Sequence, residues 1–401
     1  MRAVTRTLDE WLGDDAIVPD LNDVARDDGL LFVRDGQGVA GRGEAIRLDA
    51  DQAARWLGEI DHDSTVDQAA PVALGTIPFE PGAAAEVVVP EVAVVKRFGR
   101  CWITTVADHD IDVAAALSAG PEPTPAAPSW TIEPGVEVEH YLAAVTAARD
   151  AVQSGALTKA VIARTVVVSA DQPISIHAVL RRLKLSFGSS YRSSIDGMIG
   201  ASPELLIAVE GDTVRSHPLA GTTPSTGDPV TDQRLAAELR ASSKNQIEHR
   251  VVIDDLHDRL LPWASYLDWE PEPSIVSVAN VQHLGTRMEG MLSEPSPTAI
   301  ELVRAVSPTP ALGGHPRDAA LELIEQVEGF GRGRYGGAVG WIDGNGDGVW
   351  AVNIRCAEFN DSRTRARLVA GGGIVAESDP LAELAETQAK FQAMLGAIIR
   401  G

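Results

Sequence analysis

Near the end of the chain, acidic and basic side chains recur at helical spacing. The segment ESDPLAELAETQAK (377–390) places Glu383 and Glu386 three residues apart and Lys390 one turn further on, so a helix brings all three to one face. Pro380 suits the first turn of such a helix. Paired carboxylates on one face suit Mg²⁺, which takes one or two carboxylates together with waters and substrate oxygens. A solvated salt bridge between Glu386 and Lys390 explains the same spacing, and the motif by itself favours that simpler interpretation.

A second acidic position lies in the segment SSKNQIEHRVVIDDL (242–256). Its valine and leucine residues mark a buried helical face and leave Asn245 and Glu248 three residues apart on another side. His249 follows Glu248 directly, which suggests a transition-metal pair. However, neighbours on a helix point about 100° apart, because there are 3.6 residues per turn. We therefore expect no shared ligand role for Glu248 and His249.

Two further patterns imitate ligand-binding loops but fail on their context. Gly331, Gly333 and Gly336 have the G-x-G-x-x-G spacing of dinucleotide sites. That fingerprint must follow a strand and open a helix, whereas here it follows a predicted helix and opens a predicted strand. The segment DGNGDG (343–348) matches the first half of a calcium loop, but Ile354 stands where the bidentate glutamate is required. We therefore predict a hairpin turn at 343–348 and neither ligand.

The elements that must position the acidic residues can be predicted from apolar periodicity. Strand-like segments joined by short turns are frequent, and the regular β-α-β alternation of a doubly wound fold is absent. This pattern indicates an α+β fold with mainly antiparallel sheets. Helices are predicted at 136–154, 175–187, 232–261 with a break, 297–305, 317–328 and 381–399, and strands at 29–34, 86–95, 159–169, 191–220 as an antiparallel meander, 274–290, 335–342, 349–359 and 365–375.

The composition limits the class of protein and its partners. The chain has 401 residues, 44% of them hydrophobic and 23% charged, which is typical of a soluble globular protein. A formal net charge of −23 disfavours nucleic acid and anionic membrane surfaces as partners. An anionic substrate therefore needs a local positive group, such as a metal ion or a buried arginine. Two cysteines, no signal-peptide pattern and no long apolar run predict a cytoplasmic protein without disulfides.

The order and spelling of the motifs resemble those of the chorismate-utilising enzymes, most closely the isochorismate synthases of menaquinone and siderophore pathways. Nine blocks appear in the order in which that family has them, which makes the resemblance specific. They are LTKAVIAR (157–164), GASPELL (200–206), SHPLAGT (216–222), SSKNQIEH (242–249), VQHLGT (281–286), PTPALGG (308–314), GRGRYGGAVGW (331–341), NIRCAE (353–358) and AGGGIVAESDPLAELAET (370–387).

The resemblance runs from about residue 136 to 397 and implies one large α+β domain with the site in a central cleft. We therefore predict that 131–401 is the chorismate-binding catalytic domain. Residues 1–130 are predicted to be the N-terminal part of the fold and carry no recognised motif, and a proline-rich connection is predicted at 121–134. Asn245 and Ser307 depart from the family's pattern, and neither is expected to abolish activity.

The resemblance also implies a reaction and the residues that carry it. Lys159 matches the general base that takes a proton from water as the water attacks C2 of the chorismate ring, so it must lose its own proton some of the time. Glu204 matches the general acid that protonates the departing C4 hydroxyl. Glu248 and Glu386 match the Mg²⁺ ligands, with Glu383 assisting through waters. The metal would hold the ring carboxylate of chorismate, a dianion.

A further set of residues is implied to bind the substrate itself. Tyr335 and Arg355 match residues that hold the enolpyruvyl carboxylate, for which the arginine fork is suited. A solvent-facing position on a strand would explain Arg355 equally well from its neighbours alone. The remaining implied substrate-binding residues are Gly221, Thr222, His283, Gly371, Gly372, Gly373 and Lys390.

Two positions separate the branches of this family. Relatives that add ammonia have a glutamine where Lys159 stands, and the aminodeoxychorismate branch has a lysine where this chain has Ala220. The resemblance therefore implies water as the nucleophile and no glutaminase subunit. A monomer or homodimer is expected, although neither position bears on the oligomeric state. The spelling of GASPELL (200–206) and PTPALGG (308–314) favours an enzyme that stops at isochorismate. A salicylate synthase, which goes on to eliminate pyruvate, and a non-catalytic chorismate-binding protein of the same fold are the alternatives.

Overall fold

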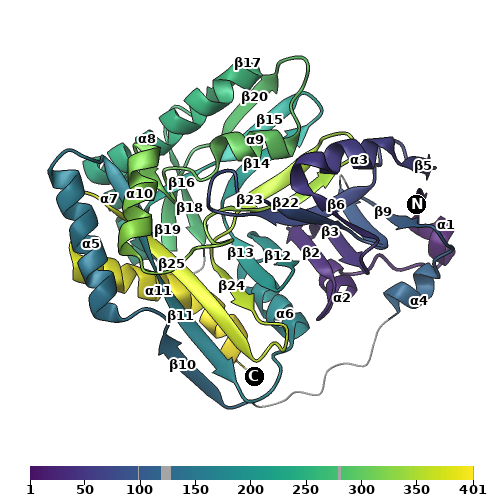
Figure 1. Ribbon diagram of the computed structural model, residues 1–401, viewed down its shortest axis with the longest axis horizontal. Helices are drawn as coiled ribbons and strands as arrows, with labels where there is room; N and C mark the ends of the chain where they lie inside the picture. Colours follow the sequence, from purple (N-terminus) through teal and green to yellow (C-terminus); the bar gives the residue numbers. More distant parts are fainter. Residues whose placement is uncertain (98, 119–127, 279–280, 401) are drawn as a thin grey trace.

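The computed structural model describes residues 1–97, 99–118, 128–278 and 281–400. Within these residues the strands form three sheets (Figure 1). The largest contains, in spatial order, β10 (Trp130–Pro134), β11 (Lys159–Ala170), β25 (Arg365–Ile374), β24 (Cys356–Phe359), β13 (Met198–Ser202), β12 (Tyr191–Ile195), β2 (Leu30–Arg34), β3 (Gln37–Arg42), β8 (Val92–Arg97), β9 (Arg100–Ala107), β1 (Arg2–Thr7) and β5 (Asp61–Ser64), with β21 (Gly314–His315) beside β11.

The second and third sheets are smaller. The second contains β17 (Ala264–Trp269), β20 (Met288–Leu292), β15 (Thr213–His217), β14 (Leu205–Glu210), β23 (Gly348–Val352), β22 (Ala338–Asp343), β6 (Val72–Ile77), β7 (Glu86–Val89) and β4 (Ile46–Asp49). The third contains β16 (Leu219–Pro224), β19 (Val281–Gly285) and β18 (Ser274–Val278). In the described ranges every strand pairing except that of β1 with β5 is antiparallel. The longest antiparallel pairing joins β11 to β25.

Helices cover the outer faces of these sheets. They are α1 (Leu8–Leu12), α2 (Leu21–Ala25), α3 (Ala53–Glu59), α4 (Val113–Leu117), α5 (Val138–Gln153), α6 (Ile176–Phe187), α7 (Pro229–Ala241), α8 (Ser243–Leu260), α9 (Ala299–Val306), α10 (Arg317–Val327) and α11 (Pro380–Ile399). Among the helices of the described ranges, none has both the length and the apolar composition that a membrane crossing requires. The predicted α+β class with mainly antiparallel sheets is confirmed.

The alternation of side chains along each strand builds the layers. Leu31 and Val33 of β2 point into a core shared with α2, α6 and α11. Phe32, between them, points the other way and packs in a core with Leu74 and Trp341 of the second sheet. This period of two is expected of strands buried on both faces. The first two sheets therefore pack face to face, with α2, α6 and α11 outside the first.

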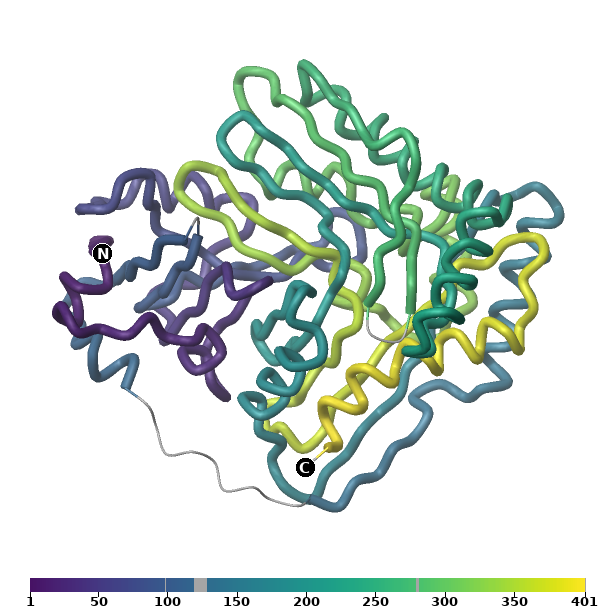
Figure 2. The backbone as a smooth tube through the Cα atoms, turned by 180° about the vertical axis from the view of Figure 1, so that it is seen from behind, coloured from purple at the N-terminus to yellow at the C-terminus, as the bar shows by residue number. Residues whose placement is uncertain are grey.

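Residues before and after the proposed division at 130 share both large sheets. β2 pairs with β12, and β6 pairs with β22. Figure 2 shows the β22–β23 hairpin reaching into the N-terminal part of the chain. The division into two parts at residue 130 therefore stays a prediction, and the boundary does not coincide with a boundary between sheets. Residues 121–127 of the predicted proline-rich connection lie outside the described residues, and 130–134 form β10 rather than a connection.

Four strand predictions were wrong in the same way, because the chain changes sheets where one continuous element was expected. The strand predicted at 86–95 is divided into β7, in the second sheet, and β8, in the first, and the strand region predicted at 274–290 contains β18 and β19, in the third sheet, and β20, in the second. The meander predicted at 191–220 leaves the first sheet after β13, enters the second at β14 and reaches the third at β16. The strand predicted at 349–359 is divided into β23, in the second sheet, and β24, in the first. Residues 353–355 make that second crossing, and Arg355 has a φ of +53°, which ends the extended conformation. Arg355 is therefore not on the solvent face of a strand.

Candidate active site

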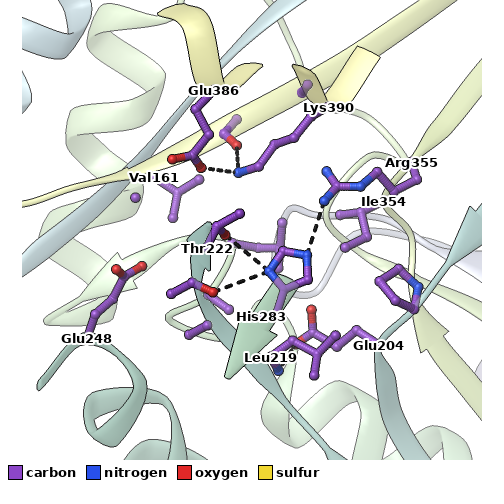
Figure 3. A pocket seen from close by; sticks show the side chains of 18 of the residues that line it. Val161, Glu204, Leu219, Thr222, Glu248, His283, Ile354, Arg355, Glu386 and Lys390 are labelled. Carbon is purple, nitrogen blue, oxygen red and sulfur yellow. Dashed lines mark hydrogen bonds and ion pairs between the residues drawn. The ribbon is translucent and has the colours of Figure 1, made fainter. Parts of the chain in front are cut away.

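A cavity lies where the two crossings, the third sheet and the ends of β11 and β25 meet. It brings together all of the predicted site residues except Gly372 and Glu383. The empty space measures about 710 Å³, counting its opening to solvent. Figure 3 shows Glu248 and Glu204 at opposite sides of this cavity and His283 between them, with Glu386 and Lys390 above and Arg355 at the upper right. The cavity is thus lined by both acidic and basic groups.

Lys159 begins β11, whose β-branched residues form a buried strand in the first sheet. The residue is 2% exposed. Its Nζ lies 2.8 Å from Oε1 of Glu248 on α8, whose side chain is 12% exposed. A buried ammonium needs such a partner, because an isolated buried charge is strongly disfavoured. The residue predicted as a base and one predicted as a metal ligand are therefore in direct contact.

Glu204 lies on the first crossing, between β13 and β14, and is 3% exposed. Its Oε1 accepts a hydrogen bond from the backbone N–H of Leu219 across 3.3 Å. Burial raises the pKa of Glu204 to about 7, against the smaller opposing effects of the Leu219 N–H and the charges of Lys159 and Arg355. A carboxyl group in this environment keeps its proton near neutral pH and can donate it.

The two crossings are hydrogen-bonded to each other. The N–H of Val352 donates to the carbonyl of Glu204 across 3.1 Å, and the N–H of Ala201 donates to the carbonyl of Arg355 across 3.2 Å. The left-handed conformation of Arg355 is costly for a residue with a Cβ, by roughly 1–2 kcal/mol. Such strain persists only where the surroundings hold it in place. This pairing fixes Glu204 and Arg355 relative to each other.

His283 of β19 connects Arg355 to the third sheet. Nη2 of Arg355 lies 3.3 Å from Nε2 of His283, and Nδ1 of His283 lies 3.3 Å from the carbonyl of Gly221 and 3.1 Å from Oγ1 of Thr222. Because a guanidinium can only donate, Nε2 accepts and the ring proton is on Nδ1. Burial, followed by the charge of Arg355, lowers the pKa of His283 to about 3, so the ring is neutral. Tyr335, 4% exposed, lines the cavity nearby from the turn before β22.

The backbone at Gly221 requires glycine. β16 has a register shift against β19 between Ala220 and Thr222, so Gly221 is the extra residue of a bulge, and its φ is +73°. A Cβ there would also lie 3.1 Å from the side chain of Asn245. The bulge allows both Gly221 and Thr222 to line the cavity and directs the Gly221 carbonyl towards His283.

The three glycines of β25 are not a bulge, since the strand pairs with β11 without a shift from Arg365 to Ile374. Their absent side chains leave room on two sides. A Cβ on Gly373 would lie 2.6 Å from Oε1 of Glu248, and one on Gly371 would meet β11. A Cβ on Gly372 would lie 2.8 Å from Oε2 of Glu383 and 3.8 Å from Oε1 of Glu386, on the side of α11. Alternation along the strand therefore explains why Gly372 is not in the cavity lining.

The α11 carboxylates are in unlike environments. Burial and then the charge of Glu386 raise the pKa of Glu383 to about 7. Burial opposes ionisation of Glu386 too, but the ammonium of Lys390, 2.5 Å away, lowers the pKa of Glu386 below its usual value. Lys390 also donates to the carbonyl of Gly371 across 2.7 Å. The salt bridge expected from spacing is thus present, but it lies in the cavity wall rather than on a solvated face.

The donor set at α11 suits a hard cation. Oε2 of Glu383 is buried and has no hydrogen-bond partner in the described part of the chain, while Oε1 accepts from Ser378. An unpartnered buried carboxylate oxygen beside a second carboxylate is a chemically suitable ligand for Mg²⁺. In the described ranges no three His, Cys, Asp or Glu side chains already form a ligand cluster. Glu248 is instead held by Lys159, so a shared ion would require that contact to open.

Sequence reasoning missed the apolar part of the cavity lining. These residues lie inside or next to the quoted motifs, so the signal that could have found them is their position beside the polar residues of each block. They are Val161, Pro203, Leu219, Ala220, Ala311, Leu312, Ile354, Val369 and Ala370.

Comparisons with known proteins agree with this architecture. Residues 47–399 match the family model described as chorismate binding enzyme. A putative isochorismate synthase MenF of Mycobacterium tuberculosis is 41% identical over 342 residues, which is 82% of this chain and 87% of the relative. The isochorismate synthase DhbC of Bacillus subtilis is 38% identical over 342 residues, 82% of this chain and 81% of the relative.

Solved structures give the same result. A putative 2,3-dihydroxybenzoate-specific isochorismate synthase, DhbC from Bacillus anthracis, superimposes with a TM-score of 0.79 at 31% identity, covering 94% of this chain and 98% of the other. The menaquinone-specific isochorismate synthase MenF from Escherichia coli has a TM-score of 0.85 at 23% identity and covers 100% of this chain and 94% of the other. At that identity the second likeness concerns the fold alone.

Proposed function

Since this chain belongs to the family of chorismate binding enzymes, we propose that it is an isochorismate synthase, which isomerises chorismate to isochorismate. The relatives that it matches over most of their length are named for this activity. One observation carries the proposal to the level of residues. Lys159 and Glu204, from different elements, are both almost completely buried and line one cavity with Arg355.

The reaction requires one proton to be taken and one to be given. Lys159 accepts a proton from water as the water oxygen bonds to C2 of the ring, and the ring double bonds shift towards C4. Glu204 donates its proton to the C4 hydroxyl, which leaves as water. Its pKa of about 7 keeps it protonated in part of the molecules at neutral pH. The two side chains therefore have opposite tasks, since Lys159 takes a proton and Glu204 gives one.

The positive groups of the cavity attract a substrate that the surface as a whole repels. Arg355 can hold a carboxylate with two parallel hydrogen bonds, and Tyr335 can donate a third from its hydroxyl. His283 keeps one nitrogen of the Arg355 guanidinium occupied, which leaves the rest of the fork for the enolpyruvyl carboxylate. These local positive groups allow a dianion to bind although the formal charge of the whole chain is −23.

Mg²⁺ is part of the proposal. Glu386 and Glu248 would hold the ion, with Glu383 assisting through waters, and the unpartnered Oε2 of Glu383 supports this set. Bound there, the ion would neutralise the ring carboxylate and draw electron density from the ring. Glu248 would then exchange its contact with Lys159 for the metal.

The experiment is to incubate the purified chain with chorismate, with Mg²⁺ or with EDTA, and to separate the products by chromatography. We expect isochorismate as the main product with Mg²⁺ and none with EDTA. Salicylate and pyruvate as main products would replace the proposal with a salicylate synthase. Binding of chorismate without any turnover would indicate the non-catalytic alternative.

A further inference from the structure

A buried ion pair lies behind the cavity, and the proposed reaction does not use it. Glu328 follows the end of α10, and Arg332 lies in the glycine-rich turn that leads to β22. Each residue is 2% exposed. Nε of Arg332 donates to Oε2 of Glu328 across 2.8 Å, and Nη2 donates to Oε1, so the pair is bidentate.

Three further hydrogen bonds join the pair to the backbone of β11 and of the loop before β21. Nη1 of Arg332 donates to the carbonyl of Leu312, and Nη2 donates to the carbonyl of Val161, each across 2.7 Å. Oε1 of Glu328 accepts from the N–H of Ala163 across 2.6 Å. The pair therefore joins β11 to the loop before β21.

Two of the three backbone groups that are held in this way, the carbonyls of Val161 and Leu312, belong to residues that line the cavity. Val161 follows Lys159 by two positions on β11, so both point into the cavity, and both line it. Leu312 lines the same cavity. The N–H of Tyr335 donates to the carbonyl of Arg332 across 3.1 Å, so the turn that carries Tyr335 begins at the pair.

One flat face of the Arg332 guanidinium is covered by an aromatic ring. It lies over the ring of Phe79, 4.3 Å from its centre, and the N–H of Phe79 donates to the carbonyl of Gly333 across 2.9 Å. A buried ion pair contributes little to stability in comparison with apolar residues of the same size. What this pair supplies, with a partner at each of its nitrogens and oxygens, is one fixed geometry.

We propose that Glu328 and Arg332 are positioning residues that hold the start of β11, the 308–314 loop and the Tyr335 turn in the arrangement that catalysis needs. This inference rests on the proposed function, because the positions of Lys159, Leu312 and Tyr335 affect turnover only if chorismate reacts in this cavity. It also gives a role to the second residue of the G-x-G-x-x-G pattern, which does not bind a nucleotide.

The test compares Arg332→Lys with a matched control. Lysine keeps the charge but cannot form the planar fork that reaches Glu328, Leu312 and Val161 together. The control is Arg192→Lys, since Arg192 is 1% exposed, donates to Oδ1 of Asn22 across 2.7 Å and does not line the cavity. We expect kcat of Arg332→Lys to fall by about tenfold or more, and to change more than KM. Arg192→Lys should keep the kcat of the folded protein.

Hydrogen exchange provides a readout that needs no substrate. In Arg332→Lys, deuterium uptake should rise at 159–165 and 308–314 relative to Arg192→Lys, at matched distance from each variant's melting temperature. If Arg332→Lys does not fold, Glu328→Asp replaces it, because the shorter carboxylate withdraws from Ala163 while both charges remain.

The outcomes separate the two proposals. Unchanged uptake at both segments overturns the inference, as does faster uptake combined with a wild-type kcat. If the wild-type chain leaves chorismate unchanged, the proposed function fails, while the uptake measurement still decides whether the pair holds β11 and the loop in place.

Discussion

Nζ of Lys159 and Oε1 of Glu248 form a buried ion pair, 2.8 Å apart, with side chains that are 3% and 12% exposed. The pair joins the start of β11 to α8, and it fits because β25 has a glycine opposite it. A Cβ on Gly373 would lie 2.8 Å from Cε of Lys159 and 2.6 Å from Oε1 of Glu248. The proposed base and a proposed metal ligand thus share one contact that a single methyl group can disturb.

The first prediction concerns that glycine. Gly373→Ala should displace the pair without unfolding the strand, because both nearby atoms belong to side chains and Gly373 is in regular β25. We expect kcat to fall by about tenfold or more, with an unchanged circular dichroism spectrum. Gly331→Ala is the matched control, since a Cβ there has nothing within 4 Å. Full activity in Gly373→Ala would show that turnover does not depend on the Lys159–Glu248 geometry.

The second prediction concerns the base. Lys159→Ala should lower kcat by about 10²–10⁴-fold, the usual contribution of a general base, and should keep chorismate affinity within a few fold. Calorimetric titration with chorismate and steady-state kinetics measure the two effects separately. Lys184→Ala is the control, because Lys184 pairs with Asp20 at the surface with its side chain 47% exposed. An alanine variant at 159 with wild-type kcat would remove lysine from the mechanism.

The third prediction concerns the acid and pH. The folded-state pKa of Glu204 is raised to about 7 by burial, so its stability contribution is lost as pH rises through that value. Glu204→Gln removes the buried charge and should be more stable than the wild type at pH 8, by up to about 3 kcal/mol, with the gain shrinking towards pH 5. Urea unfolding at several pH values measures this, and an equal difference at pH 5 and 8 would contradict it.

The same residue predicts the pH dependence of turnover. Because a general acid must carry its proton, wild-type kcat should fall as pH rises above about 7. Glu204→Gln should lose this limb of the profile together with about 10²-fold or more of kcat.

The fourth prediction concerns the metal. Mg²⁺ at ten times its Kd should stabilise the wild-type chain by about 1.4 kcal/mol, because a bound cation would offset the burial and the repulsion from Glu386 that together raise the pKa of Glu383. Glu386→Gln should lose most of this gain and the Mg²⁺ dependence of turnover. Thermal unfolding with Mg²⁺ and with EDTA checks this, and exposed Glu377→Gln serves as control. An equal Mg²⁺ effect in Glu386→Gln would place the ion elsewhere.

Local pattern was sufficient for most elements, and the candidate residues followed from the resemblance of short motifs to those of a family. The helices containing Glu248 and Glu386 follow from apolar spacing, and the break between α7 and α8 falls where Ser242 caps the second helix. Each candidate residue lies in a short motif whose chemistry can be stated without coordinates. Periodicity and motifs are properties of neighbouring residues, which is why a single chain reveals them.

The tertiary structure alone decided which of these residues meet. Pairing partners in a sheet are distant along the chain, so nothing local showed that the chain crosses between sheets at Glu204 and again at Arg355, or that the two crossings bond to each other. The Glu328–Arg332 pair was hidden for the same reason, since its acceptors and donors are up to 171 residues away. Burial makes such contacts strong and specific, and burial is a property of the whole fold.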